Sequence, residues 1–225
     1  MVGTIHLYEE ARPTLKAILN ELNPRVLTVE ISRFSIDFRQ RHHLAWKERL
    51  ERAIQHLGLS IRDCHVLELL KRQISMPYEW QVAKSFAVER GVRVVPIDIS
   101  ELSKMELPLW EEELLSEKNI KCIVLNSRDE TLDRHFNRIR CEAASLLKGI
   151  QPMRSERIHP LTWLGDPFWQ RREKILFRRL MRIVRLAGGV VHVSGWMHCV
   201  AGSPWQTLTD HIIAKGQEVT VIPAF

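Results

Sequence analysis

Short apolar runs alternate with longer amphipathic segments along the whole chain. The runs are rich in Val and Ile, as is typical of buried strands. They cover residues 2–7, 25–31, 92–97, 120–125, 190–194 and 218–222. The segments between them repeat apolar residues every three to four positions, which is the helical period. This alternation predicts an α/β fold, a mostly parallel central sheet of about six strands flanked by helices.

Stop signals and caps place the ends of several predicted helices. Asn23 and Pro24 end the first helix, and Gly91 ends a helix over residues 78–90. Ser203 and Pro204 resemble a cap and a first turn, and they predict the start of a helix over residues 204–213. Further helices are predicted over residues 107–118 and 128–147.

Two segments interrupt the alternation. Residues 34–75 are charged and helical in pattern, and they are predicted to form a helical insertion after the second strand. This insertion either covers a site or forms a homodimer surface. Residues 150–165 form the one extended irregular connection, either a functional lid or a plain loop. With 225 residues, of which 45% are hydrophobic, the chain is predicted to fold as a single α/β domain over residues 1–225.

The formal net charge of +6 raises the question of a nucleic-acid partner. Much of the excess lies in residues 171–185, where Arg and Lys are interleaved with Ile, Leu and Phe. That pattern predicts an amphipathic helix with a basic solvent face. A partner protein, an anionic lipid and nucleic acid are the alternatives for this face. No zinc-finger or RNA-binding motif accompanies it, so nucleic-acid binding ranks last.

The composition favours a protein of a reducing compartment. No run approaches 18 uninterrupted apolar residues, and the first residues are typical of a strand and not of a signal peptide. The four cysteines show no Cys-x-x-Cys pairing, as expected for free thiols. We therefore expect a cytoplasmic protein without a transmembrane segment.

Two Gly-x-x-His segments, Gly3–His6 and Gly195–His198, each lie at the end of an apolar, strand-like run. A glycine has no Cβ, so the backbone can turn sharply or approach another group closely, and the imidazole can point into a crevice. The segments are nearly a whole chain apart, so they form one site only if the first and last strands lie together. A third match, Gly189–His192, lies inside an apolar run and is interpreted as incidental.

Polar residues gather at the carboxyl ends of five predicted strands, where parallel α/β sheets bind their ligands. These residues are His6, Glu30, Asp98, Asn126 with Arg128, and His198. Glu30 ends an apolar run, so its carboxylate needs a cation or hydrogen-bond donors. Asp98 is either a functional residue or a helix cap. Residues 128–130 are either only the acidic first turn of a helix, which suits the helix dipole, or a functional segment. Arg128 favours the second, because a cation is unfavourable in a first turn and indicates an anionic partner.

These residue types support one kind of chemistry. Two neutral imidazoles and a carboxylate with an open fourth position form the usual catalytic zinc set, and added oxygen ligands suit Mn²⁺ or Co²⁺. Such a metal lowers the pKa of bound water to about 7. A second carboxylate can take the proton, and an arginine can hold an oxyanion or a substrate carboxylate.

At these residues the sequence resembles the TraB/PrgY family and its superfamily, which includes the Tiki metalloproteases, GumN-like proteins, ChaN-like proteins and erythromycin esterases. The matching pieces are Gly3–His6 with Glu9 and Glu10, Thr28–Glu30, Tyr78 and Glu79, Val94–Asp98, Asn126–Glu130, and Val193–His198. Their order and spacing cover nearly the whole chain. The chain departs from the family at Asn126–Arg128, where the family more often has Glu-Arg, and at Trp196 and Met197, which are bulkier than usual.

The resemblance implies a metal-dependent hydrolase that acts on a peptide or ester, with Mn, Co or Zn as the metal. The site residues expected from the motifs and the resemblance are His6, His198 and Glu30 as metal ligands, Glu30, Glu79 and Arg128 as catalytic groups, and Glu10, Asp98 and Asn126 as substrate contacts. The alternative is a non-catalytic protein of the same fold that binds or sequesters a peptide or small ligand, as the pheromone-shutdown members of the family are thought to do.

Overall fold

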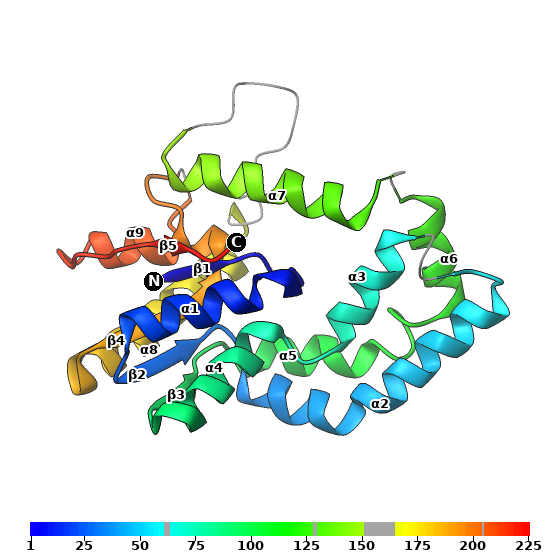
Figure 1. Cartoon of the computed structure of the whole chain (residues 1–225), viewed down its shortest axis with the longest axis horizontal. Helices are drawn as coiled ribbons and strands as arrows, with labels where there is room; N and C mark the ends of the chain where they lie inside the picture. The colour runs from blue at the N-terminus through cyan, green and yellow to red at the C-terminus, as the bar shows by residue number, and fades with distance from the viewer. Residues whose placement is uncertain (61–63, 128–129, 151–164, 204) are drawn as a thin grey trace.

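The computed structural model describes residues 1–60, 64–127, 130–150, 165–203 and 205–225 (Figure 1). Within these ranges five strands form one sheet in the order β3-β2-β4-β1-β5, and every neighbouring pair is parallel. The strands are β1 (Val2–Thr4), β2 (Val26–Val29), β3 (Arg93–Pro96), β4 (Val190–Gly195) and β5 (Ile222–Pro223). The prediction of an α/β fold with a parallel sheet is confirmed.

The run at residues 120–125 is helical, so the strand predicted there is wrong. It belongs to α6 (Glu117–Leu125), whose cap Ser116 accepts a hydrogen bond from the backbone N–H of Asn119 at 3.2 Å. Ile120 is the buried residue of this helix, and it packs among apolar side chains of α2 and α3. The cap and these helical neighbours override the strand propensity of the run.

The other helices separate the strands as the alternation predicted, except that no helix was predicted at residues 100–106. They are α1 (Arg12–Leu22), α2 (Arg33–His56), α3 (His65–Ile74), α4 (Tyr78–Arg90), α5 (Ser100–Glu106), α7 (Leu132–Leu147), α8 (Pro167–Ala187) and α9 (Leu208–Ile213), with 3-10 turns η1 (Glu9–Ala11), η3 (Leu107–Leu109) and η5 (Trp196–Cys199). As predicted, α1 ends at Asn23 and α4 at Gly91, both in the left-handed region.

Two predicted helix starts and one predicted helix are wrong. Thr207 caps α9 in a capping box with Asp210, so this helix starts later than residue 204. Thr131 caps α7, which therefore starts later than residue 128. Within residues 107–118 the chain forms η3 and turns before α6. In these places a side chain that satisfies the first N–H groups determines the start of the helix.

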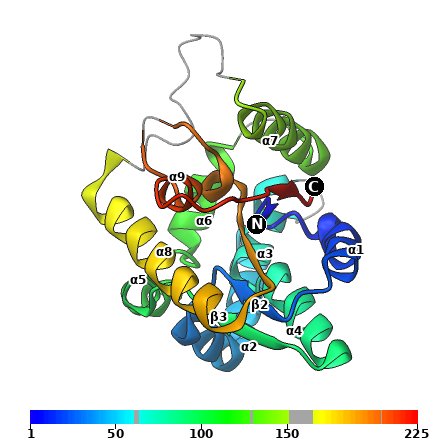
Figure 2. The same cartoon turned by 90° about the vertical axis from the view of Figure 1, so that its left-hand side faces the viewer.

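Helices cover both faces of the sheet (Figure 2). On one face α1 and α4 pack Leu15, Leu19 and Phe86 against strand residues such as Leu27. On the other face α8 and α9 form an apolar cluster that includes Leu176 and Leu180. Residues alternate between these faces along each strand, so both faces are buried and the polar groups of the strands collect at their ends.

A second group of helices, α2, α3, α5 and α6, lies beyond the carboxyl ends of the strands (Figure 1). It has its own apolar cluster, which includes Trp46, Leu50 and Leu67. Residues 34–75 are thus largely helical, as the pattern predicted, and their status as an insertion stays a prediction. Nearly all of the connection predicted at residues 150–165 lies outside the described residues.

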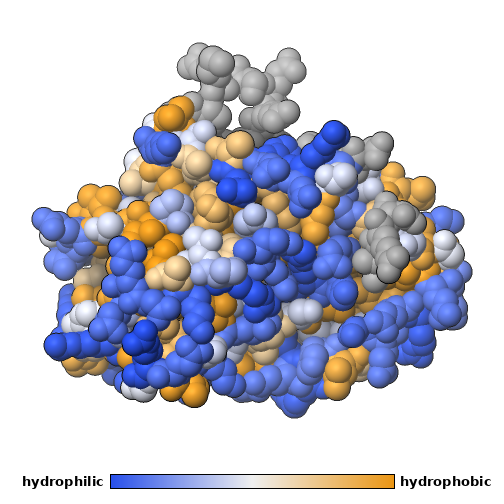
Figure 3. Space-filling view, viewed as in Figure 1, coloured by the Kyte–Doolittle hydropathy of each residue, from blue (hydrophilic) through white to orange (hydrophobic). Residues whose placement is uncertain are grey.

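The face seen in Figure 3 mixes hydrophilic and hydrophobic residues. In the part of the chain that the structure describes, no helix is both long enough and apolar enough to cross a membrane.

Candidate functional site

The two Gly-x-x-His segments lie side by side, because β1 and β4 are neighbours. In their register Gly3 pairs with Ser194, and Thr4 pairs with Gly195. A Cβ on Gly195 would lie 2.6 Å from Nε2 of His6, and a Cβ on Gly3 would lie 3.3 Å from Sγ of Cys199. Each glycine therefore makes room for the other segment, which explains the close approach that the motifs require.

His6 stands at a sharp bend just after β1. Leu7, the next residue, has a φ of +67°, which is unfavourable for a residue with a Cβ. The bend is held by two hydrogen bonds, from the N–H of Tyr8 to the carbonyl of Ile5 at 3.1 Å and from Nη1 of Arg72 to the carbonyl of Leu7 at 2.8 Å. Backbone strain of this kind is often retained where a side chain must point in a fixed direction.

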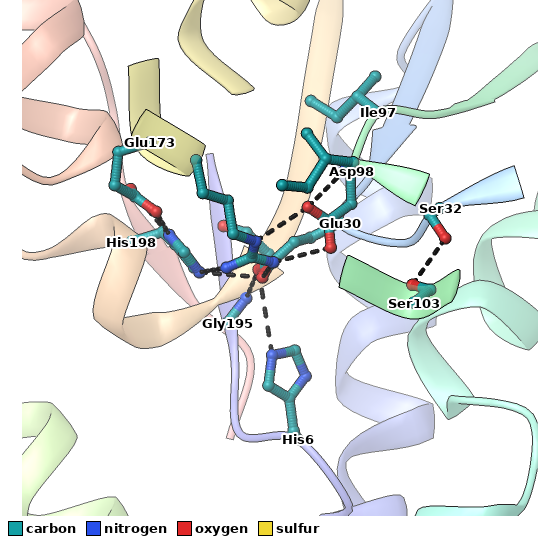
Figure 4. A network of polar contacts seen from close by, with 12 residues as sticks. His6, Glu30, Ser32, Ile97, Asp98, Ser103, Glu173, Gly195 and His198 are labelled. Carbon is teal, nitrogen blue, oxygen red and sulfur yellow. Dashed lines mark hydrogen bonds and ion pairs between the residues drawn. The ribbon is translucent and has the colours of Figure 1, made fainter. Parts of the chain in front are cut away.

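The two imidazoles are held in the same way. Nδ1 of His6 lies 2.8 Å from Oε1 of Glu79, and Nδ1 of His198 lies 2.7 Å from Oε1 of Glu173. Both Nε2 atoms are directed at Glu30 (Figure 4): that of His198 is 2.9 Å from Oε1, and that of His6 is 4.0 Å from Oε2. One carboxylate thus lies between two imidazoles, and each imidazole has a further carboxylate behind it.

Glu30 is the most heavily bonded group of the cluster. Its Oε2 accepts the backbone N–H of Gly195 at 2.8 Å, and its Oε1 accepts Nη2 of Arg172 at 2.5 Å. Burial would raise the pKa of Glu30, but the charges of His198 and Arg172 outweigh it and hold this pKa well below its usual range. Glu30 is therefore ionised in the folded protein.

The basic residues of the segment 171–185 were predicted on the solvent face of a helix, and the structure corrects this for Arg172, which is buried beside Glu173. Both residues lie on α8, and their side chains are buried, with exposed fractions of 8% for Arg172 and 0% for Glu173. Arg172 donates two hydrogen bonds to Asp98, from Nε at 2.9 Å and from Nη2 at 2.8 Å. Their spacing from Leu176 and Leu180 contained the signal, because residues four apart share a helix face.

The histidines differ in exposure and in protonation. Burial would lower the pKa of His198, but Glu173 and Glu30 outweigh it and raise this pKa to about 10. Burial would also lower the pKa of His6, but the neighbouring Glu79 and Glu30 outweigh burial and raise this pKa. The side chain of His6 is 48% exposed, so solvent weakens the effect there. Without another cation His198 is an imidazolium between two carboxylates.

Part of the cluster lines a cleft of about 260 Å³, whereas the buried side chains of His198, Arg172 and Glu173 are not among its lining residues. His6, Glu30, Glu79 and Asp98 line it from the ends of the strands and from α4. On the far side it is lined by residues of α2, α3 and α5, which include Ser35, Arg39, Arg72 and Ser103. The cleft lies at the carboxyl ends of parallel strands, where ligands of such sheets bind.

The structure brings five of the predicted site residues together: His6, Glu30, Glu79, Asp98 and His198. Glu10 lies outside this cluster and pairs with Arg72 through two hydrogen bonds at 2.8 and 2.9 Å. Asn126 is not at the end of a strand as predicted, because α6 replaces that strand, and its side chain donates to the carbonyl of Cys122 at 2.8 Å. Arg128 lies outside the described residues.

A second cluster of histidines and a carboxylate lies between α3 and α7. One ligand atom each from His65, Glu130 and His135 lies within 4.8 Å of the other two, so this set could hold a metal ion. Oε1 of Glu130 is 3.1 Å from Nδ1 of His135 and 3.9 Å from Nε2 of His65. It also accepts Nη2 of Arg138 at 3.1 Å. We call this set the α3/α7 cluster.

His192, the third Gly-x-x-His histidine, takes no part in either cluster. It lies inside β4, and its Nδ1 is 3.0 Å from the hydroxyl of Thr28. Burial lowers its pKa to about 4, so the ring is neutral.

Comparison with known proteins adds no relative. No protein-family model matches the chain, and neither a curated protein nor a solved structure gives a significant match. Inference about function therefore starts from the site geometry.

Proposed function

We propose that the chain is a metal-dependent hydrolase whose metal is held by His6, His198 and Glu30, with a peptide or ester as the substrate. The observation that carries this proposal is the common arrangement of the imidazoles. Each Nδ1 faces its own carboxylate, and both Nε2 atoms face Glu30. Histidines that ligate metals almost always pair their second ring nitrogen in this way.

The charges of the cluster fit a cation. Four carboxylates, those of Glu30, Glu79, Asp98 and Glu173, stand against the single guanidinium of Arg172. With neutral imidazoles three negative charges remain, which is costly where Glu30 and Glu173 are almost fully buried. Either protons on the histidines or a divalent cation can offset this excess. Two imidazoles and one carboxylate suit zinc, and further oxygen ligands suit Mn²⁺ or Co²⁺.

We propose different roles for the two glutamates that line the cleft. Both oxygens of Glu30 are used, by His198 and Arg172 on one side and by Gly195 and His6 on the other. Glu30 therefore serves as the ligand. Glu79 uses Oε1 for His6 and Thr4, and its Oε2 has no hydrogen bond to the described residues. We assign Glu79 as the proton acceptor.

A bound divalent ion would polarise the scissile carbonyl and acidify water. The side chains of the cluster orient the ligands and move the proton. Glu79 and Glu173 keep the imidazoles oriented, with Nδ1 protonated and Nε2 available. Glu79 accepts a proton from water at its free oxygen and returns it to the leaving group. Asp98 holds Arg172 beside Glu30, where the guanidinium partly neutralises the ligand carboxylate.

The proposal is tested by turnover on a panel of peptides and esters. The protein is stripped with a chelator and then reloaded separately with Zn²⁺, Mn²⁺ and Co²⁺. We expect turnover to return with at least one metal, and to fall by about 100-fold or more in Glu79→Gln. Glu68→Gln is the matched control, because Glu68 pairs with Arg72 and does not line the cleft. Saturable binding without turnover under any metal would instead favour the binding or sequestering protein, and absence of both would reject the proposal.

A further inference from the structure

Arg39 is a buried cation that the site described above does not use. It lies on α2, its exposure is 7%, and it lines the cleft opposite His6, Glu30 and Glu79. Its spacing of three residues from Ile36 and seven from Trp46 places it on the apolar side of the helix, where a charged side chain is rare.

All the partners of Arg39 are neutral. Its Nε donates to the hydroxyl of Ser35 at 3.1 Å, and its Nη1 donates to the carbonyls of Gln73 and Ser75 at 2.6 and 2.7 Å. The guanidinium also lies over the ring of Trp110, 4.7 Å from its centroid. Among the described residues no carboxylate pairs with it, and burial alone lowers the pKa of Arg39 to about 10.

The structural role of Arg39 does not use the whole guanidinium. Nη1 fastens α2 to the end of α3, while Nε bonds Ser35 of α2 itself, and these atoms account for every hydrogen bond that the Arg39 side chain makes to described residues. Nη2 remains. Arg72, a neighbouring guanidinium of the same cleft, differs because Glu10 and Glu68 neutralise it. A buried charge without a counter-ion is costly, and a ligand anion would supply the missing partner.

We propose that Arg39 binds a carboxylate of the substrate, so that the cleft accepts peptides or esters that end in a free carboxyl group near the bond to be cleaved. This inference rests on the proposed function because it places the substrate in that cleft. The two sides of the cleft would then bind different parts of the substrate. The strand ends would hold the reacting group, and α2 would hold the carboxylate. An arginine fork suits a carboxylate because both oxygens can be engaged at once.

The test compares the binding of N-acetyl-alanyl-alanine with that of its carboxamide, measured by calorimetric titration of the full chain. Each titration is made once with the protein stripped of metal and once after the protein has been reloaded with metal. We expect the acid to bind at least about tenfold more tightly than the amide, since hydrogen bonds to charged groups are the stronger ones. Arg39→Met should remove this preference, and Arg39→Lys should keep part of it. Arg41→Met is the matched control, because Arg41 lies on the exposed side of the same helix.

Because the preference is a ratio, partial unfolding of a variant cannot imitate its loss. Equal affinity for acid and amide, an undiminished preference in Arg39→Met, or no binding of the acid would overturn the inference. Preference for the acid that depends on Arg39, with no turnover under any metal, would leave the carboxylate site in place and reject the hydrolase.

Discussion

The molecule contains two groups of histidines around a glutamate and an arginine, and they differ in what stands behind the histidines. At the strand ends His6 and His198 each have a carboxylate at Nδ1, in addition to the shared Glu30. In the α3/α7 cluster both histidines face the one carboxylate of Glu130, and among the described residues neither forms an ion pair with a second acid. The two clusters thus differ in their second carboxylates, although each brings two histidines close to one glutamate.

The difference shows in protonation. Carboxylates raise the pKa of His198 to about 10, whereas burial and the neighbouring His135 lower the pKa of His65. At the strand ends the excess of negative charge attracts protons or a metal ion. In the α3/α7 cluster Arg138 already neutralises Glu130. Histidines of metal centres usually have a second partner of this kind, and among the described residues the strand-end histidines have one whereas His65 and His135 do not.

The largest difference between the clusters should appear when each loses its arginine. Arg172→Met leaves Asp98 as a largely buried carboxylate without a counter-ion and leaves Glu30 with only the histidines as partners. We therefore expect the free energy of unfolding to fall by about 3 to 5 kcal/mol. Arg138→Met, whose side chain is 38% exposed, should cost less than about 1 kcal/mol. Urea unfolding of both variants measures this. Equal losses would remove the distinction between the clusters.

A buried histidine without a carboxylate provides the next contrast. The pKa of His192 is about 4 in the folded protein and about 6.5 when unfolded, so the unfolded state takes up the proton first as the pH falls. The free energy of unfolding should therefore decrease between about pH 6.5 and pH 4, by about 3 kcal/mol from this residue. Urea unfolding across this range should show a shallower decrease for His192→Gln. The same slope in both proteins would contradict this assignment.

Part of this account could be predicted from the sequence. The residues at the ends of β1, β2, β3 and β4 could be placed together, because parallel strands present their carboxyl ends at one edge. Arg172 and Arg39 were missed because charged residues within helices are usually read as solvent-facing. For both, the spacing from buried apolar residues was the available signal. The helix α6 was missed because an apolar run of six residues fits a strand and a buried helix equally well.

Gly195→Ala tests the close approach of the two segments with a small effect on the fold. The backbone φ of −56° suits alanine, but the new Cβ would lie 2.6 Å from Nε2 of His6. Since half of the His6 side chain is exposed, the ring can swing away from Glu30, and we expect a stability loss of about 1 kcal/mol with loss of bound metal. The double variant with His6→Ala should match His6→Ala alone in metal content. Metal retained in Gly195→Ala would contradict the proposed approach.

The smallest effect is expected in the α3/α7 cluster. His135→Ala should change the free energy of unfolding by about 0.5 kcal/mol, because its contact with Glu130 is partly exposed and Arg138 remains. It should also leave turnover unchanged. A loss of activity as large as that of His198→Ala would show that this cluster, and not the strand ends, holds the functional metal.

The central claim is tested most directly by the metal content of the purified, tag-free protein, measured by plasma mass spectrometry after loading and dialysis. His6→Ala, His198→Ala and His65→Ala are measured beside the unmodified chain. The proposal predicts about one equivalent of Zn, Mn or Co that is lost in His6→Ala and His198→Ala and kept in His65→Ala. Metal that stays in the first two variants and disappears in the third would place the ion in the α3/α7 cluster and contradict the account.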